Sequence, residues 1–171
     1  MVLRDATAPS RDNVLAKMTP QPGELDYPMA IFDKVICRDG DLAVKFRIKP
    51  SPSRYKTVGL VWRYQDPRNY YLLHFSVDEK NIMLLRMQDG QAKPIPLAGK
   101  PAASGVTHEL KLDQWYAARV IFRGNNIRVL FGNRQLFDAV DDSLPNAGKT
   151  GVWTRGGTEA AFDDFRIDKK A

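Results

Sequence analysis

The sequence predicts an all-β fold in which two antiparallel sheets pack face to face. Apolar and polar side chains alternate with a period of two, turn residues separate the alternating segments at intervals of about 8–12 residues, and no segment has helical spacing. About a dozen short strands are expected, arranged as a two-sheet jelly-roll sandwich. The 171 residues, 43% of them hydrophobic, suffice for one domain with a core.

Three segments in the first half carry the alternation. In 41–49 every second residue is apolar, and mostly charged residues stand between them. In 57–65 strict alternation places Tyr64 on the main apolar face and Arg63 on a second face that is only half polar. The segment 69–78 is apolar on both faces, which is typical of a central strand.

The second half is predicted to form hairpins. Asp89-Gly90 is a hairpin signal after the segment 82–88. The segment 91–97 contains two prolines, which restricts it to an edge strand or a loop. The remaining strands are expected at 114–123, 127–131, 135–140, 148–154 and 158–167.

The last of these segments contains two adjacent aspartates. Strict alternation would point Phe162 and Phe165 to opposite faces, and likewise Asp163 and Asp164. One of the two carboxylates is therefore expected to lie inward or near a loop. There it needs backbone N–H groups, a cation or an arginine.

Residues 1–26 have less pattern than the rest of the chain. One strand is expected over 13–18, and the region is expected to wrap the sandwich or add an edge strand to a single domain, 1–171. The first residues lack a basic stretch followed by an apolar one, so they do not form a signal peptide. The protein is therefore expected to be either cytoplasmic or exported with its leader removed.

The charge balance admits anionic partners, because the net charge is +6. Its distribution nevertheless argues against a nucleic-acid-binding protein and favours a solvated outer face, because the strand arginines stand singly. These are Arg47, Arg63, Arg119, Arg123, Arg128 and Arg166. No apolar run approaches the roughly 18 residues of a membrane span.

Cysteine and histidine are scarce. The single cysteine, Cys37, excludes an internal disulfide and is expected to be buried. The two histidines, His74 and His108, lie far apart in the sequence, so a His/Cys zinc site is excluded.

Several stretches resemble the strand motifs of laminin-G-like, concanavalin A-like jelly rolls. They are GLVWRYQDP (59–67) with NYY (69–71), Trp115 with GNRQLF (132–137), and GKTGVWT (148–154) with FDDF (162–165). Within that superfamily the chain is most similar, over 40–167, to the domain of bacterial three-keto-disaccharide hydrolases and their uncharacterised exported relatives. The resemblance implies a glycan-binding or glycan-processing domain of an exported bacterial protein.

No catalytic motif of that superfamily is present. Laminarinase-type glucanases on this fold carry E-x-D-x-x-E on one strand face, so that acid and nucleophile approach the sugar together. The glutamates here, Glu24, Glu79, Glu109 and Glu159, have no partner at that spacing. No G-x-S-x-G elbow or phosphate-binding glycine loop occurs either. Catalytic residues therefore stay unassigned, and whether the protein is an enzyme is open.

The candidate site is a saccharide-binding face on the concave sheet. Sugars offer an apolar C–H face and a rim of hydroxyls, so aromatic rings and planar polar groups suit them. Mid-strand positions in three successive segments could place Arg63, His74 and Arg86 on that face, with Tyr70 beside His74. Trp153 and Arg155 could flank it. In the alternative interpretation the arginines are solvated, His74 is a satisfied core histidine and Trp153 is core.

Three further possibilities remain. Relatives of this fold often hold calcium through aspartates near the chain ends, and Asp163 or Asp164 could do so with Asp26 or Asp33; no other cofactor is expected. A three-keto-glycoside hydrolase-like enzyme would use His74 as base. A structural or interaction module would bind acidic glycans or proteins through its surface charge, which the pI near 9.5 fits. The ligand and the oligomeric state are left open.

Overall fold

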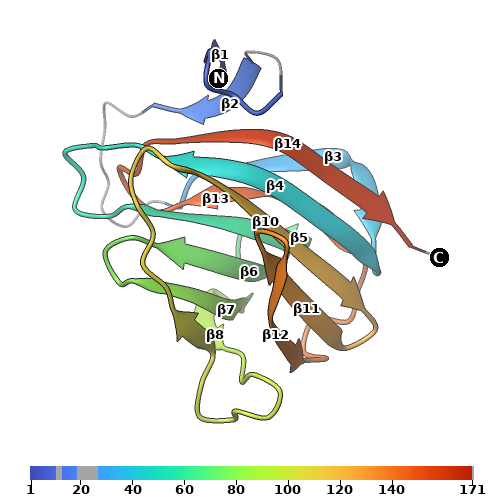
Figure 1. Cartoon of the computed structure of the whole chain (residues 1–171). Helices are drawn as coiled ribbons and strands as arrows, with labels where there is room; N and C mark the ends of the chain where they lie inside the picture. Colours follow the sequence, from blue (N-terminus) through green and yellow to red (C-terminus); the bar gives the residue numbers. More distant parts are fainter. Residues whose placement is uncertain (11–12, 19–26, 171) are drawn as a thin grey trace.

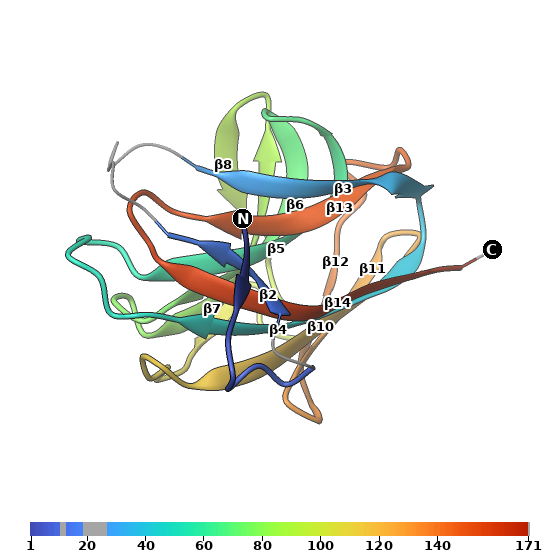
Figure 2. The ribbon, with the colours of Figure 1, turned by 90° about the horizontal axis from the view of Figure 1, so that it is seen from above.

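The computed structural model describes residues 1–10, 13–18 and 27–170. Within these ranges the chain forms 14 strands in two sheets and no helix, so the predicted all-β sandwich is confirmed. Consequently the described part of the chain contains no helix that could cross a membrane. Figures 1 and 2 show the two layers in perpendicular views.

Sheet A has seven strands in the spatial order β1-β2-β14-β4-β10-β11-β12. Their bounds are β1 (Val2–Arg4), β2 (Asn13–Lys17), β4 (Gly40–Ile48), β10 (Trp115–Arg123), β11 (Asn126–Phe131), β12 (Arg134–Val140) and β14 (Ala160–Lys169). The hairpin β1–β2 lies beyond β14, at the edge of the sheet (Figure 1). The strand expected over 13–18 is β2.

Sheet B has the order β3-β13-β5-β6-β7-β8, and the short β9 also pairs with β7. The bounds are β3 (Met29–Cys37), β5 (Thr57–Asp66), β6 (Asn69–Ser76), β7 (Asn81–Gln88), β8 (Gln91–Pro94), β9 (Gly105–Thr107) and β13 (Gly148–Thr154). The proline-containing segment forms the edge strand β8, where a missing N–H costs no ladder bond.

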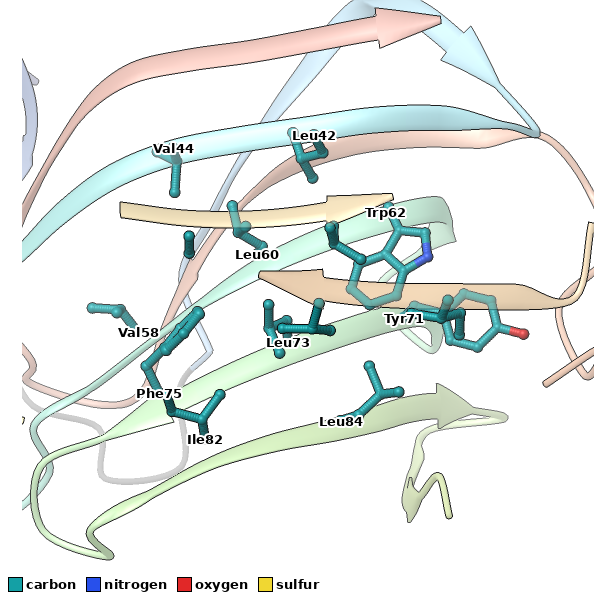
Figure 3. Close-up of a cluster of buried hydrophobic side chains, with 14 of the residues drawn as sticks. Leu42, Val44, Val58, Leu60, Trp62, Tyr71, Leu73, Phe75, Ile82 and Leu84 are labelled. Carbon is teal, nitrogen blue, oxygen red and sulfur yellow. The ribbon is translucent and has the colours of Figure 1, made fainter. Parts of the chain in front are cut away.

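The core lies between the sheets, where alternate side chains of both layers interdigitate. In Figure 3, Trp62, Tyr71 and Phe75 of sheet B face Leu42 and Val44 of sheet A. The Trp62 and Tyr71 rings stack with centroids 5.4 Å apart. Removing this apolar surface from water is the main stabilising contribution to the fold, at about 25 cal/mol per Å².

A β-bulge in β5 overturns the strict alternation expected for 57–65. Arg63 has a φ of 46°, and the pairing register with β6 shifts between Trp62 and Asp66. The extra residue turns the Arg63 side chain into one end of the sandwich and sends Tyr64 to the outer face of sheet B. The expectation that Tyr64 shares the face of Trp62 is therefore wrong.

Glycine is required opposite this bulge. A Cβ on Gly148 of β13 would lie 2.4 Å from the carbonyl carbon of Arg63 and 2.7 Å from the backbone nitrogen of Tyr64. Real Cβ atoms do not approach backbone so closely, so only a residue without a side chain lets β13 pass the bulge.

Buried polar groups close this end of the sandwich. Arg63, only 2% exposed, donates hydrogen bonds to the carbonyl oxygens of Arg38 (2.8 Å), Leu144 (3.1 Å) and Gly124. Nearby, Asp141 accepts a hydrogen bond from the Tyr71 hydroxyl at 2.7 Å. The same carboxylate is paired with the Arg86 guanidinium. These bonds satisfy groups that would be costly to bury alone.

A second bulge, in β14, overturns the expectation for Phe162 and Phe165. Asp164 has a φ of 50°, and the pairing with β4 shifts register between Asp163 and Arg166. The inserted residue brings both phenylalanines against the core cluster between the sheets. The prediction that they point to opposite faces is therefore wrong.

The outer face of sheet A carries ion pairs between neighbouring strands. Arg119 donates to Asp41 with Nε–Oδ1 of 2.7 Å, and Arg128 to Asp138 with Nε–Oδ1 of 2.9 Å. The hydrogen bond from Arg119 lowers the pKa of Asp41. The Arg128 side chain is 54% exposed, as expected for a solvated outer face, and such an exposed pair contributes little to stability. The Arg119 side chain is 41% exposed, but its partner Asp41 is buried.

We expect Arg63→Met to destabilise the fold by about 3 kcal/mol, because it leaves buried carbonyl oxygens without donors. Urea unfolding followed by tryptophan fluorescence measures the change. Arg128→Met removes a guanidinium whose side chain is 54% exposed and should change stability by about 0.5 kcal/mol or less. Equal effects of the two substitutions would contradict this account of Arg63.

Candidate functional site

Aromatic side chains gather on the outer face of sheet B. Tyr27 precedes β3, Tyr64 lies on β5, Tyr70 and His74 lie on β6, and Trp153 lies on β13; these five residues are called the outer aromatic cluster. Segments far apart in the chain thus present their rings on one surface.

Ring contacts connect the cluster in two groups. Tyr27 stacks on Trp153 with centroids 5.5 Å apart and an interplanar angle of 15°. The indole is also 6.1 Å from the His74 ring. On the other side, Tyr64 and Tyr70 lie 5.9 Å apart. Burial raises the pKa of Tyr70 to about 12, so this hydroxyl stays protonated at neutral pH.

Register and a glycine bring Trp153 and His74 together. Gly59 of β5 is the pairing partner of Trp153 on one side and of His74 on the other. A Cβ on Gly59 would lie 2.4 Å from Leu72 Cδ1 and 3.4 Å from Trp153 Cε3. The absent side chain therefore leaves the space across β5 in which the indole reaches toward His74.

His74 is a neutral, nearly buried imidazole. It is 5% exposed, and its Nδ1 has no hydrogen-bond partner among the described residues. Burial lowers its pKa from 6.5 to about 4, with Glu79 opposing the shift and Arg155 adding to it. A buried polar atom without a partner calls for a physical explanation, and an absent ligand group is one.

Arg63 and Arg86 do not share a face with His74, so that part of the expected site is wrong. The β6–β7 register pairs His74 with Met83 and Tyr71 with Arg86. Arg86 is three residues after Met83, and residues an odd number apart along a strand point to opposite faces. Because Met83 is paired with the outward-facing His74, Arg86 points to the inner side, where it pairs with Asp141. The bulge at Arg63 turns that side chain inward as well.

Arg155 lies at the rim of the cluster, just after β13. Its guanidinium carbon is 3.9 Å from the centroid of the Tyr55 ring, and its Nη1 is 3.3 Å from Glu79 Oε1. Tyr70 and His74 lie on one face, as expected. Trp153, expected to flank them, lies on the same face beside His74, while Arg155 stands beside the cluster and has partners of its own.

The adjacent aspartates have partners within the protein. Asp163, buried as expected for one of the pair, accepts hydrogen bonds from the Ser10 amide at 2.7 Å and the Asp164 amide at 2.8 Å. Asp164 pairs with Lys45 at 2.7 Å. Among residues 1–10, 13–18 and 27–170 no group of three His, Cys, Asp or Glu side chains is placed to hold a metal ion. The carboxylates of Glu24 and Asp26 lie outside these ranges.

Hollows are found on other parts of the molecule, away from the outer aromatic cluster. One of about 660 Å³ lies on the outer face of sheet A. It is lined by Lys45 of β4, Arg119 of β10, Arg166 of β14 and Asn133 in the turn between β11 and β12. Two adjoining ones, of about 220 and 300 Å³, lie at the edge of the sandwich between β2 and β3. The view from above shows these strands at that edge (Figure 2). Both share the apolar residues Leu15, Ala30, Val152 and Phe162.

Sequence reasoning missed two members of the outer aromatic cluster. Tyr64 was assigned to the wrong face because no residue type marks the bulge at Arg63. Tyr27 directly follows the region of weakest pattern, 1–26, and lies outside any strand, so periodicity carries no information about its neighbours.

Known structures of low sequence identity share this fold. The carbohydrate-binding module CBM66 from Bacillus subtilis matches with a TM-score of 0.75 and 16% identity, over 92% of each chain. The GH43 protein BlXynB from Bacillus licheniformis matches with 0.65 and 16%, over 98% of this chain and 35% of that one. Chicken galectin 2 matches with 0.53 and 9%, over 75% and 89%. No family model and no curated protein matches the chain.

These likenesses, together with the strand order, show that the chain shares the fold of CBM66 and galectin 2, a sandwich of two antiparallel β-sheets. At such identities they describe the fold alone, and the chemistry has to be argued from the site.

We expect His74 to make stability depend on pH. Its folded-state pKa of about 4 is below the ordinary 6.5, so the unfolded chain takes up a proton first as the pH falls. The neutral form of the buried His74 thus contributes to the free energy of unfolding above pH 6.5, and this contribution is lost as the pH falls toward 4. The full effect is about 3 kcal/mol.

Urea unfolding at a series of pH values tests this expectation. The stability difference between wild type and His74→Leu should decrease by about 3 kcal/mol from pH 7 to pH 4. Met83→Leu, at the paired position on β7, should keep the wild-type pH dependence. A difference for His74→Leu that is independent of pH would contradict the low pKa.

Proposed function

We propose that the protein is a carbohydrate-binding domain whose site is the outer face of sheet B. The observation that carries the proposal is the outer aromatic cluster, in which Trp153 lies beside a histidine whose Nδ1 has no partner among the described residues. Aromatic faces stack on the C–H face of a sugar ring, and a neutral imidazole exchanges hydrogen bonds with hydroxyls. The likeness in fold to a carbohydrate-binding module supports the same assignment.

The composition of this face favours a neutral ligand. Between the aromatic residues lie Val61, Leu72, Leu85 and Met87, whose side chains form one apolar cluster with Tyr70 and Trp153. Within the part of the chain that the structure describes, the ion pair at the cluster is that of Arg155 with Glu79, at the rim. A neutral saccharide can lie on such a floor without leaving a charge uncompensated.

Two alternative functions would each use particular residues of this protein. A three-keto-glycoside hydrolase would need His74 to abstract a proton, and a base with a pKa of about 4 is weak for that task at neutral pH. A module that binds acidic glycans by surface charge would use the arginines of sheet A, where Arg119 and Arg128 already pair with carboxylates.

A glycan array followed by calorimetry tests the proposal with wild type, Tyr64→Ala and His74→Gln. We expect a neutral saccharide to bind equally well at low salt and in about 0.5 M NaCl. Salt at that concentration shortens the electrostatic screening length below about 10 Å, which weakens binding that depends on charge and leaves other binding unchanged. Each substitution should weaken that binding at least about tenfold, which corresponds to the loss of one stacking or hydrogen-bonding contact.

Arg128→Ala, on the opposite sheet, is the matched control and should bind as wild type does. Salt-sensitive binding that is restricted to sulfated or uronic glycans would favour the charge-based alternative. Cleavage of a 3-keto-glucoside that is lost in His74→Gln would favour the enzyme. Neutral-glycan binding that neither site substitution alters would overturn the proposed location.

A further inference from the structure

Trp153 is poorly accessible although it lies on the outer face of sheet B. The residue is 4% exposed, and Tyr27 stacks on its ring in a nearly parallel arrangement. Among the described residues, Gly59 leaves space for the indole within the sheet, and His74 lies 6.1 Å from it. The face of the indole that Tyr27 covers is therefore a place where a sugar ring could stack on Trp153.

Tyr27 is the most exposed member of the outer aromatic cluster, although the carbonyl oxygen of the next residue, Pro28, accepts a hydrogen bond from the Thr154 amide at 2.9 Å. Tyr27 lies outside the strands and is 41% exposed, whereas Trp153 and Tyr70 are fixed in β13 and β6. Its hydroxyl has no hydrogen bond to any residue that the structure describes. One stacked aromatic contact shifts an equilibrium about two- to tenfold, so a ligand of modest affinity suffices to replace it.

The surroundings of this position define the ligand that fits. The stacked planes of Tyr27 and Trp153 require a ring with a flat apolar face. The Nδ1 of His74 is buried and unpaired among the described residues, so a hydroxyl at the edge of a ring that uncovers it would complete its hydrogen bond. The adjoining Leu72 is apolar, and the guanidinium at the rim, that of Arg155, is already paired with Glu79, so a carboxylate or sulfate there would be desolvated without a free cation.

We propose that the Tyr27 ring occupies the position of a bound sugar, so that a neutral pyranose binds by displacing Tyr27 from Trp153. This inference rests on the proposed carbohydrate-binding function and names the stacking subsite within it. Tyr27 thereby sets the affinity, because the binding-competent state is the fraction of molecules in which Trp153 is uncovered.

Calorimetry of the full chain with neutral probes and one acidic probe tests the inference. The neutral probes are cellotetraose, mannotetraose and N-acetyllactosamine, and the acidic one is trigalacturonate. Tyr27→Ala removes the competing ring and should raise the affinity for the neutral probe about fivefold. Tyr27→Trp provides a larger competing ring and should lower it. Arg128→Ala on sheet A should leave it unchanged.

A ligand-independent measurement accompanies the titrations. Acrylamide quenching should increase in Tyr27→Ala, because uncovering Trp153 exposes one of the three tryptophans. Thermal unfolding of each variant shows whether it is folded, and Tyr27 lies outside the strands, so the sheet should persist.

The possible outcomes separate this inference from the proposed function. If Tyr27→Ala weakens binding and Tyr27→Trp strengthens it, Tyr27 is part of the sugar platform and the displacement model is wrong. If both variants bind as wild type does, the sugar lies elsewhere on the face; His74→Gln then shows whether the proposed function survives. If only trigalacturonate binds, or no probe binds any form, the inference and the neutral-glycan function both fail.

Discussion

A buried guanidinium needs several hydrogen-bond acceptors, and the way Arg63 obtains them shapes sheet B. Three backbone carbonyls, of Arg38, Gly124 and Leu144, converge on it from loops at one end of the sandwich. The side chain reaches them only because β5 bulges at this residue. The same bulge requires Gly148 on the neighbouring strand and turns Tyr64 outward. An interaction inside the fold thus decides which residues its surface presents.

The two sheets differ in what they expose. Sheet A is covered by charged side chains that pair across strands, as Arg119 does with Asp41, which suits a surface in contact with water. Sheet B is apolar on both faces, because Leu72, Leu85 and Met87 stand on its outer side. These side chains belong to a second apolar cluster, in which Val61, Tyr70, Leu72 and Trp153 are each at most 4% exposed. The outer side of sheet B thus carries a small core of its own.

On the outer face of sheet B, the rings of His74 and Trp153 belong to strands, whereas the ring of Tyr27 does not. His74 and Trp153 are held by central strands, and Gly59 fixes the distance between them by leaving space. Tyr27 adds a ring from a segment outside the strands. A fixed platform with an aromatic ring from outside the strands explains how a face of such low accessibility could still receive a ligand. The fold it shares with CBM66 and the galectins does not by itself specify these residues.

The sequence by itself determined the all-β class, most strand positions and the shared face of Tyr70 and His74, because alternation and turn chemistry are local properties. Only the tertiary structure decided the faces of Arg63, Tyr64, Phe165 and Arg86. For the first three, a bulge inserts a residue and reverses the alternation, and the bulge forms in response to partners on distant strands and loops. For Arg86 the pairing of β6 with β7 sets the face, and one residue of register exchanges inside for outside.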